Sequence, residues 1–154
     1  MTRLPGVAMM FVVALLSACG GGGSSGGGGA EGTASTYNGT ETLTITFLGE
    51  KETGTAPITI VVDQAGKVTV TDSQGTVHTG TLNGPSFAAT GKSDAMTDPA
   101  APGVSCGTSQ SYKGVVNGEN ISGTTSGTLQ CSDGSSSFTG TAEGTFEAAL
   151  AQSS

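Results

Sequence analysis

Few residues of this sequence are of types that perform chemistry, and their spacing matches no catalytic or metal-binding motif. His78 is the only histidine, so the chain offers no His cluster for zinc and no Ser-His-Asp arrangement. Asp94 and Asp98, with Ser93 and Thr97, resemble an oxygen-ligand loop but lack the dense Asp, Asn, Gly and Glu spacing of calcium loops. We therefore expect no enzymatic activity, no catalytic residue, no metal and no cofactor.

The N-terminal residues have the layout of an export leader. Arg3 gives a positive start, and the apolar run at residues 7–16 is shorter than the ~20 residues needed to span a bilayer. The run ends in the sequence LSAC at residues 16–19. This arrangement resembles the signal peptide of bacterial lipoproteins, whose lipobox has the pattern Leu, small, small, Cys. An ordinary secretory signal peptide cleaved after Ala18 is the alternative.

The resemblance implies that residues 1–18 are a signal peptide and that Cys19 becomes a lipidated N-terminus. Acyl chains such as palmitate would then modify its thiol and its new amino group, and more than one chain gives stable membrane attachment. By analogy with Gram-negative lipoproteins, Gly20 rather than Asp after the cysteine points to sorting to the outer membrane. The expected location is therefore the cell envelope, with the protein lipid-anchored in the outer membrane.

Residues 19–36 comprise the lipidated cysteine and a tether. The stretch Gly20–Gly29 reads GGGGSSGGGG, and the residues up to Ser35 add no apolar side chain larger than Ala. Such a segment buries too little surface to offset the entropy of ordering it, so we expect a flexible coil. Similar Gly-rich stretches follow the lipidated cysteine in many proteobacterial surface lipoproteins, which is a resemblance of composition.

Residues 37–148 are predicted to form one all-β domain, followed by a frayed tail at 149–154. Short runs that alternate apolar and Thr side chains, separated by Gly, Asn and Asp, predict about eight strands. The expected strands are Tyr37–Leu48, Pro57–Asp63, Lys67–Asp72, Thr76–Leu82, Ser86–Lys92, Ser111–Val116, Ile121–Cys131 and Phe138–Ala148. Short turns favour an antiparallel up-and-down meander that closes into a small barrel. A two-sheet β-sandwich is the alternative.

The last predicted strand places small residues on its inward face. Period-two alternation puts five residues there: Phe138, Gly140, Ala142, Gly144 and Phe146. Glycine within a strand usually marks a tight bend or the close approach of another group. Two interpretations follow. Either the glycines reflect strong coiling of a small barrel or Phe rings from neighbouring strands that lie over them, or the barrel interior has room for a ligand.

Cys106 and Cys131 remain once the lipobox accounts for Cys19, and disulfides persist in exported domains. Continuing the register of the tight turn at residues 117–120 outward places Cys106 opposite Cys131. Directly opposite residues in antiparallel strands lie within reach of a disulfide. We therefore expect a single disulfide, and we expect it to fix the long loop at residues 93–110 rather than the core.

The connection Ser93–Gln110 is long and apolar for a fold of tight turns. Met96, Pro99, Pro102 and Val104 are its candidate ligand-contacting residues. Long ordered loops on a rigid scaffold often carry binding sites. We expect any ligand to be a small apolar molecule that enters between this loop and the adjoining turns. A crossing or capping loop without a ligand is the alternative.

Charge and composition narrow the function further. The chain has 12 acidic and 5 basic residues, for a net charge of −7, so no nucleic-acid partner is expected. The sequence predicts a lipid-anchored binding module of the cell envelope that performs no catalysis. The alternative is a structural or surface-display lipoprotein that acts through an envelope protein. Tyr37 and Tyr112 are the tyrosine anchors available for such a partner, since Trp is absent.

Overall fold

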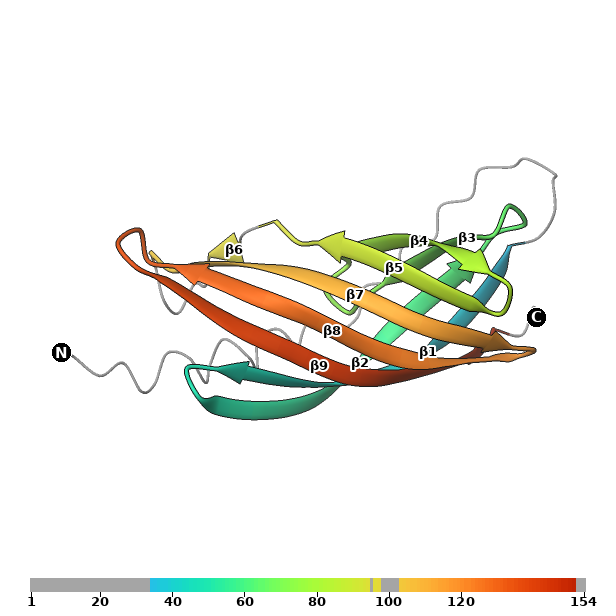
Figure 1. Cartoon of the computed structure of the whole chain (residues 1–154), viewed down its shortest axis with the longest axis horizontal. Helices are drawn as coiled ribbons and strands as arrows, with labels where there is room; N and C mark the ends of the chain where they lie inside the picture. The colour runs from blue at the N-terminus through green and yellow to red at the C-terminus, as the bar shows by residue number, and fades with distance from the viewer. Residues whose placement is uncertain (1–33, 95, 98–102, 152–154) are drawn as a thin grey trace.

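The computed structural model describes residues 34–94, 96–97 and 103–151, and every regular element in these ranges is a β-strand (Figure 1). The strands are β1 (Ser35–Phe47), β2 (Glu50–Val62), β3 (Lys67–Thr71), β4 (Val77–Asn83), β5 (Ser86–Lys92), β6 (Met96–Thr97), β7 (Ser105–Asn117), β8 (Asn120–Ser132) and β9 (Ser137–Leu150).

Eight of these strands form a closed antiparallel barrel. β1 to β5 pair in chain order, as do β7 to β9, and β9 returns to pair with β1. The pairing of β5 with β7 closes the ring, and the two-residue β6 lies outside it, paired with β7. The predicted up-and-down barrel is therefore confirmed. The sandwich alternative is wrong, because a continuous ring of hydrogen bonds replaces the free sheet edges that a sandwich has.

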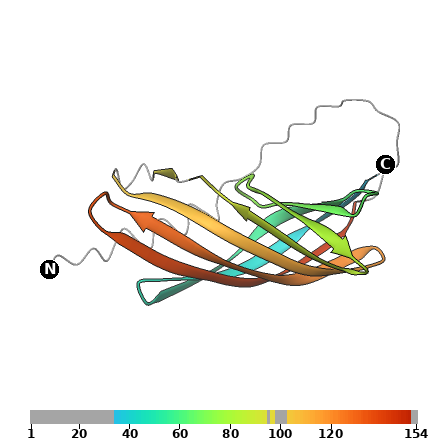
Figure 2. The same ribbon diagram turned by 45° about the horizontal axis from the view of Figure 1, so that its top comes forward.

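The strands differ in length, and this difference shapes the interior. Five strands have 13 or 14 residues, whereas β3, β4 and β5 have 5 to 7. Of the 13 residues of β2, only Thr59–Val62, its last part, pair with β3. In Figures 1 and 2 the β1–β2 and β8–β9 hairpins extend well past the short strands. One end of the barrel is therefore fully walled, and the other lacks part of its wall between β2 and β7.

The β1–β2 hairpin is longer than the sequence predicts. β2 begins at Glu50 rather than Pro57, because the chain already reverses at Leu48 and Gly49, which both have positive φ angles (52° and 87°). Such a turn matches the right-handed twist of its flanking strands. β9 also runs further, to Leu150, so residues 149 and 150 of the expected frayed tail pair with β1.

The fully walled end holds the main hydrophobic core. Its buried members are Tyr37, Ile58, Ile60, Val68, Val70, Phe87, Ala89, Tyr112, Ile121, Phe146 and Ala148. The Phe146 ring lies directly over Gly114 and Gly123, where a Cβ atom would come within about 3.0 and 2.5 Å of it. Phe47 covers Gly140 in the same way. Of the two inward glycines predicted on the last strand, Gly140 therefore lies under a Phe ring as one interpretation expected, whereas Gly144 lies against the backbone of Thr42 and the side chain of Leu43.

Cys106 and Cys131 form a disulfide, with Cα atoms 4.0 Å apart. They face each other in the register that continues from the turn at residues 117–120, as the sequence predicts. The expectation that the disulfide fixes a loop is wrong, because β7 already begins at Ser105 and pairs with β8 along its whole length. The disulfide instead cross-links two paired strands within a small buried cluster that includes Leu129.

Candidate functional site

A cavity of about 70 Å³ lies where the short strands stop. Its lining residues come from β1, β2, the β3–β4 turn, β7, β8 and β9. They are Glu41, Leu43, Ile45, Ala56, Asp72, Ser73, Gln74, Thr76, Ser93, Cys106, Thr108, Gln110, Thr128, Leu129 and Ala142. Most of the deeper side chains are aliphatic, and the two carboxylates are the charged groups of the lining. The cavity therefore separates the packed core from the incompletely walled end.

Glu41 lies on the inward face of β1 and is 2% exposed. Its Oε2 accepts a hydrogen bond of 3.1 Å from the hydroxyl of Tyr112, which is fully buried on β7 across the barrel. The Tyr112 ring in turn packs edge-on against Phe146 and His78. A carboxyl group is thus held at the boundary between the core and the cavity.

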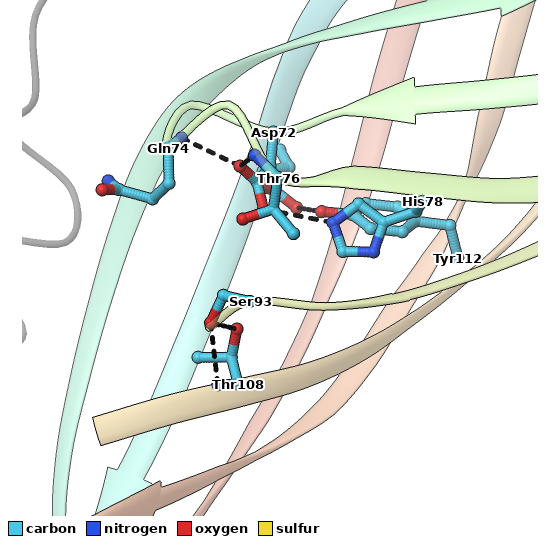
Figure 3. Close-up of polar contacts among 8 residues, drawn as sticks. Asp72, Gln74, Thr76, His78, Ser93, Thr108 and Tyr112 are labelled. Carbon is cyan, nitrogen blue, oxygen red and sulfur yellow. Dashed lines mark hydrogen bonds and ion pairs between the residues drawn. The ribbon is translucent and has the colours of Figure 1, made fainter. Parts of the chain in front are cut away.

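Asp72 directly follows β3 and organises the turn between β3 and β4. Its Oδ1 accepts hydrogen bonds of 2.9 Å from the backbone N–H groups of Gln74 and Thr76, the arrangement of an Asx turn. This leaves Oδ2 for Nε2 of His78, 3.1 Å away (Figure 3). His78 is fully buried, and its Nδ1 has no hydrogen-bond partner in the described part of the chain.

The surroundings shift the acidities of these groups in different directions. Burial raises the pKa of Glu41 to about 7, and the charge of Asp72 adds to this, although the Tyr112 hydrogen bond opposes it. Burial also raises the pKa of Asp72, but the hydrogen bonds from His78, Thr76 and Gln74 outweigh it and hold that pKa below its usual value. Burial and the neighbouring Glu41 carboxylate raise the pKa of Tyr112 well above its usual value. At neutral pH Asp72 is therefore charged, and Glu41 is partly protonated and partly ionised.

Ser93 and Thr108 form the opposite side of the cavity mouth from the Asp72–Thr76 turn (Figure 3). The Ser93 N–H donates to the Thr108 carbonyl (3.0 Å), and the Thr108 N–H donates to Ser93 Oγ (2.9 Å). Their hydroxyls lie 2.8 Å apart. These contacts extend the pairing of β5 with β7 past Lys92 and fix the edge of the mouth.

Of the predicted site residues, Cys106 lines the cavity, whereas the others lie elsewhere or fall outside the described residues. Cys19, Pro99, Pro102 and Asp98 fall outside the described residues, and for Met96 only the backbone, in β6, is described. Val104 is partly buried against the disulfide cluster rather than in the cavity lining. Among the described residues, no group of three or more His, Cys, Asp or Glu side chains is placed to hold a metal ion.

Sequence reasoning missed the polar floor of the cavity. Glu41 stands two residues before Leu43 and four before Ile45, so strict alternation puts it on the same inward face. That pattern could have identified it as a buried acid. Tyr37 and Tyr112, considered as surface anchors, are instead 5% and 0% exposed, so they face the core and are unable to contact a partner.

A second concavity, of about 550 Å³, lies on the outer face of β4, β5, β7 and β8. It is shallow, and its outward side chains are Thr81, Asn83, Ser86, Ala88, Lys113, Val115, Ser122 and Thr124. Val115 is 45% exposed there. This surface carries no cluster of charged groups comparable to the interior one.

In the described ranges, no helix has the length and apolar character to cross a membrane.

Comparison with known proteins shows the fold alone. No protein-family model matches the sequence, and no curated protein matches it. Among solved structures, a crystal structure of the vaccine antigen transferrin binding protein B, a point mutant from Haemophilus parasuis Hp5, is similar with a TM-score of 0.51 at 13% identity. The match covers 81% of this chain and 28% of that protein. This barrel therefore corresponds to a fraction of that larger molecule.

Proposed function

We propose that this protein is a lipid-anchored binding module of the cell envelope that performs no catalysis. The observation that carries the binding role is the cavity at the incompletely walled end, which opens at the surface between the β3–β4 turn and Ser93. The rest of the interior is filled by side chains, as is usual for a barrel of eight strands. The cavity combines open space, aliphatic walls and ionisable groups.

Support for the anchoring comes from the lipobox at residues 16–19 and the Gly-rich tether that follows it. A tether of about 16 residues has a root-mean-square reach of roughly 20–25 Å, which would hold the barrel clear of the membrane surface. We propose the outer membrane as the site of the anchor, since Gly20 follows the cysteine.

A second candidate is recognition of a protein partner through the outer face. The 550 Å³ concavity around Val115 favours it, and the structural neighbour is itself named for binding transferrin, a protein. Substituting Val115→Glu would weaken such a contact while leaving the interior cavity unchanged, so the two candidates are separable by experiment.

Replacing Cys19 by Ala is expected to abolish lipid anchoring. The substitution removes the thiol that would be acylated, so the protein should incorporate no labelled palmitate and should stay unprocessed, as a precursor that keeps its leader. Ser17→Ala, which keeps a small residue in the lipobox, is the matched control and should be labelled and processed like the wild type. Unchanged processing of Cys19→Ala, or a wild type that takes up no palmitate, would show that the protein is not a lipoprotein.

A further inference from the structure

The cavity contains two carboxylates and no positively charged side chain. Glu41 and Asp72 line it, whereas the four lysines of the described residues, Lys51, Lys67, Lys92 and Lys113, are all exposed and absent from the lining. Asp72 accepts hydrogen bonds from His78 and from two backbone N–H groups, and Glu41 accepts one from Tyr112. Burial raises the pKa of Glu41 to about 7, and ionisable groups perturbed in this way cluster at functional sites.

Two further polar side chains lie buried behind the cavity lining. Thr125 Oγ1 and His78 Nδ1 have no partner of hydrogen-bond geometry in the described residues. Thr125 stands opposite Tyr112 in the β7–β8 register, and its hydroxyl lies near enough to Glu41 and Tyr112 to lower the pKa of both. Neither Thr125 nor His78 belongs to the lining, so they shape the surroundings of Glu41 and make no contact with an occupant.

The size of the cavity limits its occupant. One water-sized group needs about 10–15 Å³ by this measure, so about 70 Å³ has room for roughly five to seven such groups. It is about half the volume of the ~150 Å³ enclosed cavity known to admit benzene, which favours a short, narrow occupant over an aromatic ring. The aliphatic walls, formed by Leu43, Ile45, Ala56, Leu129 and Ala142, suit a short alkyl stem.

We propose that this cavity binds a primary alkylammonium group, with its alkyl stem against the aliphatic walls and its ammonium at Glu41 and Asp72. The inference rests on the proposed function and specifies its ligand class. A purely apolar occupant would offer the carboxyl oxygens of Glu41 and Asp72 no favourable contact, and an anion would be repelled by them. A free small amine and a lysine side chain of a protein partner share this chemistry, and both reach the mouth from solvent.

The test uses NMR titration of the mature chain in detergent micelles with n-butylammonium at pH 8, with n-butanol as the uncharged probe of the same length. We expect saturable amide shifts around Ala56, Thr128 and Ala142, and affinity at least tenfold higher for the ammonium than for the alcohol. Glu41→Gln should weaken butylammonium binding at least tenfold. Glu143→Gln, which removes a carboxylate from the exposed outer face of β9, should bind like the wild type.

A second variant separates loss of charge from loss of fold. Ala142→Leu fills the cavity but keeps both carboxylates, and it should abolish binding of either probe while preserving the amide spectrum of the barrel. Lowering the pH from 8 to 6 should weaken butylammonium binding severalfold, since Glu41 becomes protonated while Asp72 stays charged. Three titratable side chains lie near Glu41: Tyr112 on β7, Asp72 in the β3–β4 turn and His78 on β4. Their titration has to be followed in the same experiment.

The outcomes distinguish this inference from the proposed function. Equal affinity for n-butanol and n-butylammonium, or wild-type affinity of Glu41→Gln, overturns the alkylammonium assignment but leaves a binding cavity. Failure of both probes to bind the wild type contradicts the cavity itself. An acetylated, amidated Ala-Ala-Lys-Ala-Ala peptide identifies the source: tighter binding than butylammonium assigns a lysine side chain, and weaker binding assigns a free amine.

Discussion

Reduction of the Cys106–Cys131 disulfide is expected to lower the free energy of unfolding by about 3 kcal/mol. The bond closes a loop with a sequence separation of 25 residues, and opening it returns that loop's conformational entropy to the unfolded chain. For a domain of this size the melting temperature should fall by about 10 °C. Urea denaturation of the oxidised and reduced protein measures the difference.

The control for reduction is the double variant Cys106→Ala with Cys131→Ala, whose stability should not respond to the reductant. The variant should also bind n-butylammonium more weakly, since Cys106 contributes to the cavity lining. Free thiols at both positions, found by peptide mapping of exported protein under non-reducing conditions, would contradict the bridge.

Glu41→Gln is expected to remove a pH dependence of stability worth about 3 kcal/mol. The pKa of Glu41 rises from 4.5 to about 7 on folding. Between these values the folded state holds a proton that the unfolded state has released, so the free energy of unfolding of the wild type falls as pH rises. Above about pH 7 this loss is complete, and below about pH 4.5 it is absent. The variant should therefore be more stable than the wild type at pH 8, with the difference closing toward pH 5.

Glu143→Gln is the control for the general effect of removing one carboxylate. It removes one carboxylate from a solvent-exposed position, so its stability curve should run parallel to that of the wild type. Asp72 contributes with the opposite sign and at lower pH, since its lowered pKa gives stability that is lost as pH falls through that pKa. Chemical denaturation at intervals from pH 4 to 8 resolves the two effects. Parallel curves for Glu41→Gln and the wild type would show that Glu41 is not buried as an acid.

The meander and the disulfide register follow from local rules that the sequence displays. Turns such as Asn117–Asn120 fix the pairing of adjacent strands, and alternation fixes which side chains face inward. The start of β7 could not be predicted, because Ser105–Gln110 reads SCGTSQ and has no alternating apolar residues. This segment becomes a strand through pairing with β8, a long-range contact that propensity does not report.

The candidate site could likewise be predicted only in part from the sequence. The inward position of Glu41 was available from alternation, but Asp72 reads only as a turn residue in sequence. Its second role, holding His78, depends on the side of the barrel on which the turn lies. The cavity itself arises because β3–β5 are shorter than their neighbours, and whether that difference leaves a gap depends on how the ring closes.

The binding role is tested most directly by native mass spectrometry of the mature lipoprotein extracted from its own host, compared with Ala142→Leu. We expect wild-type protein to carry a small bound species that is released on collisional activation, and we expect the cavity-filled variant to lack it. A wild-type mass equal to that of the acylated chain alone would contradict a ligand site inside the barrel. The same adduct on the variant would contradict it as well.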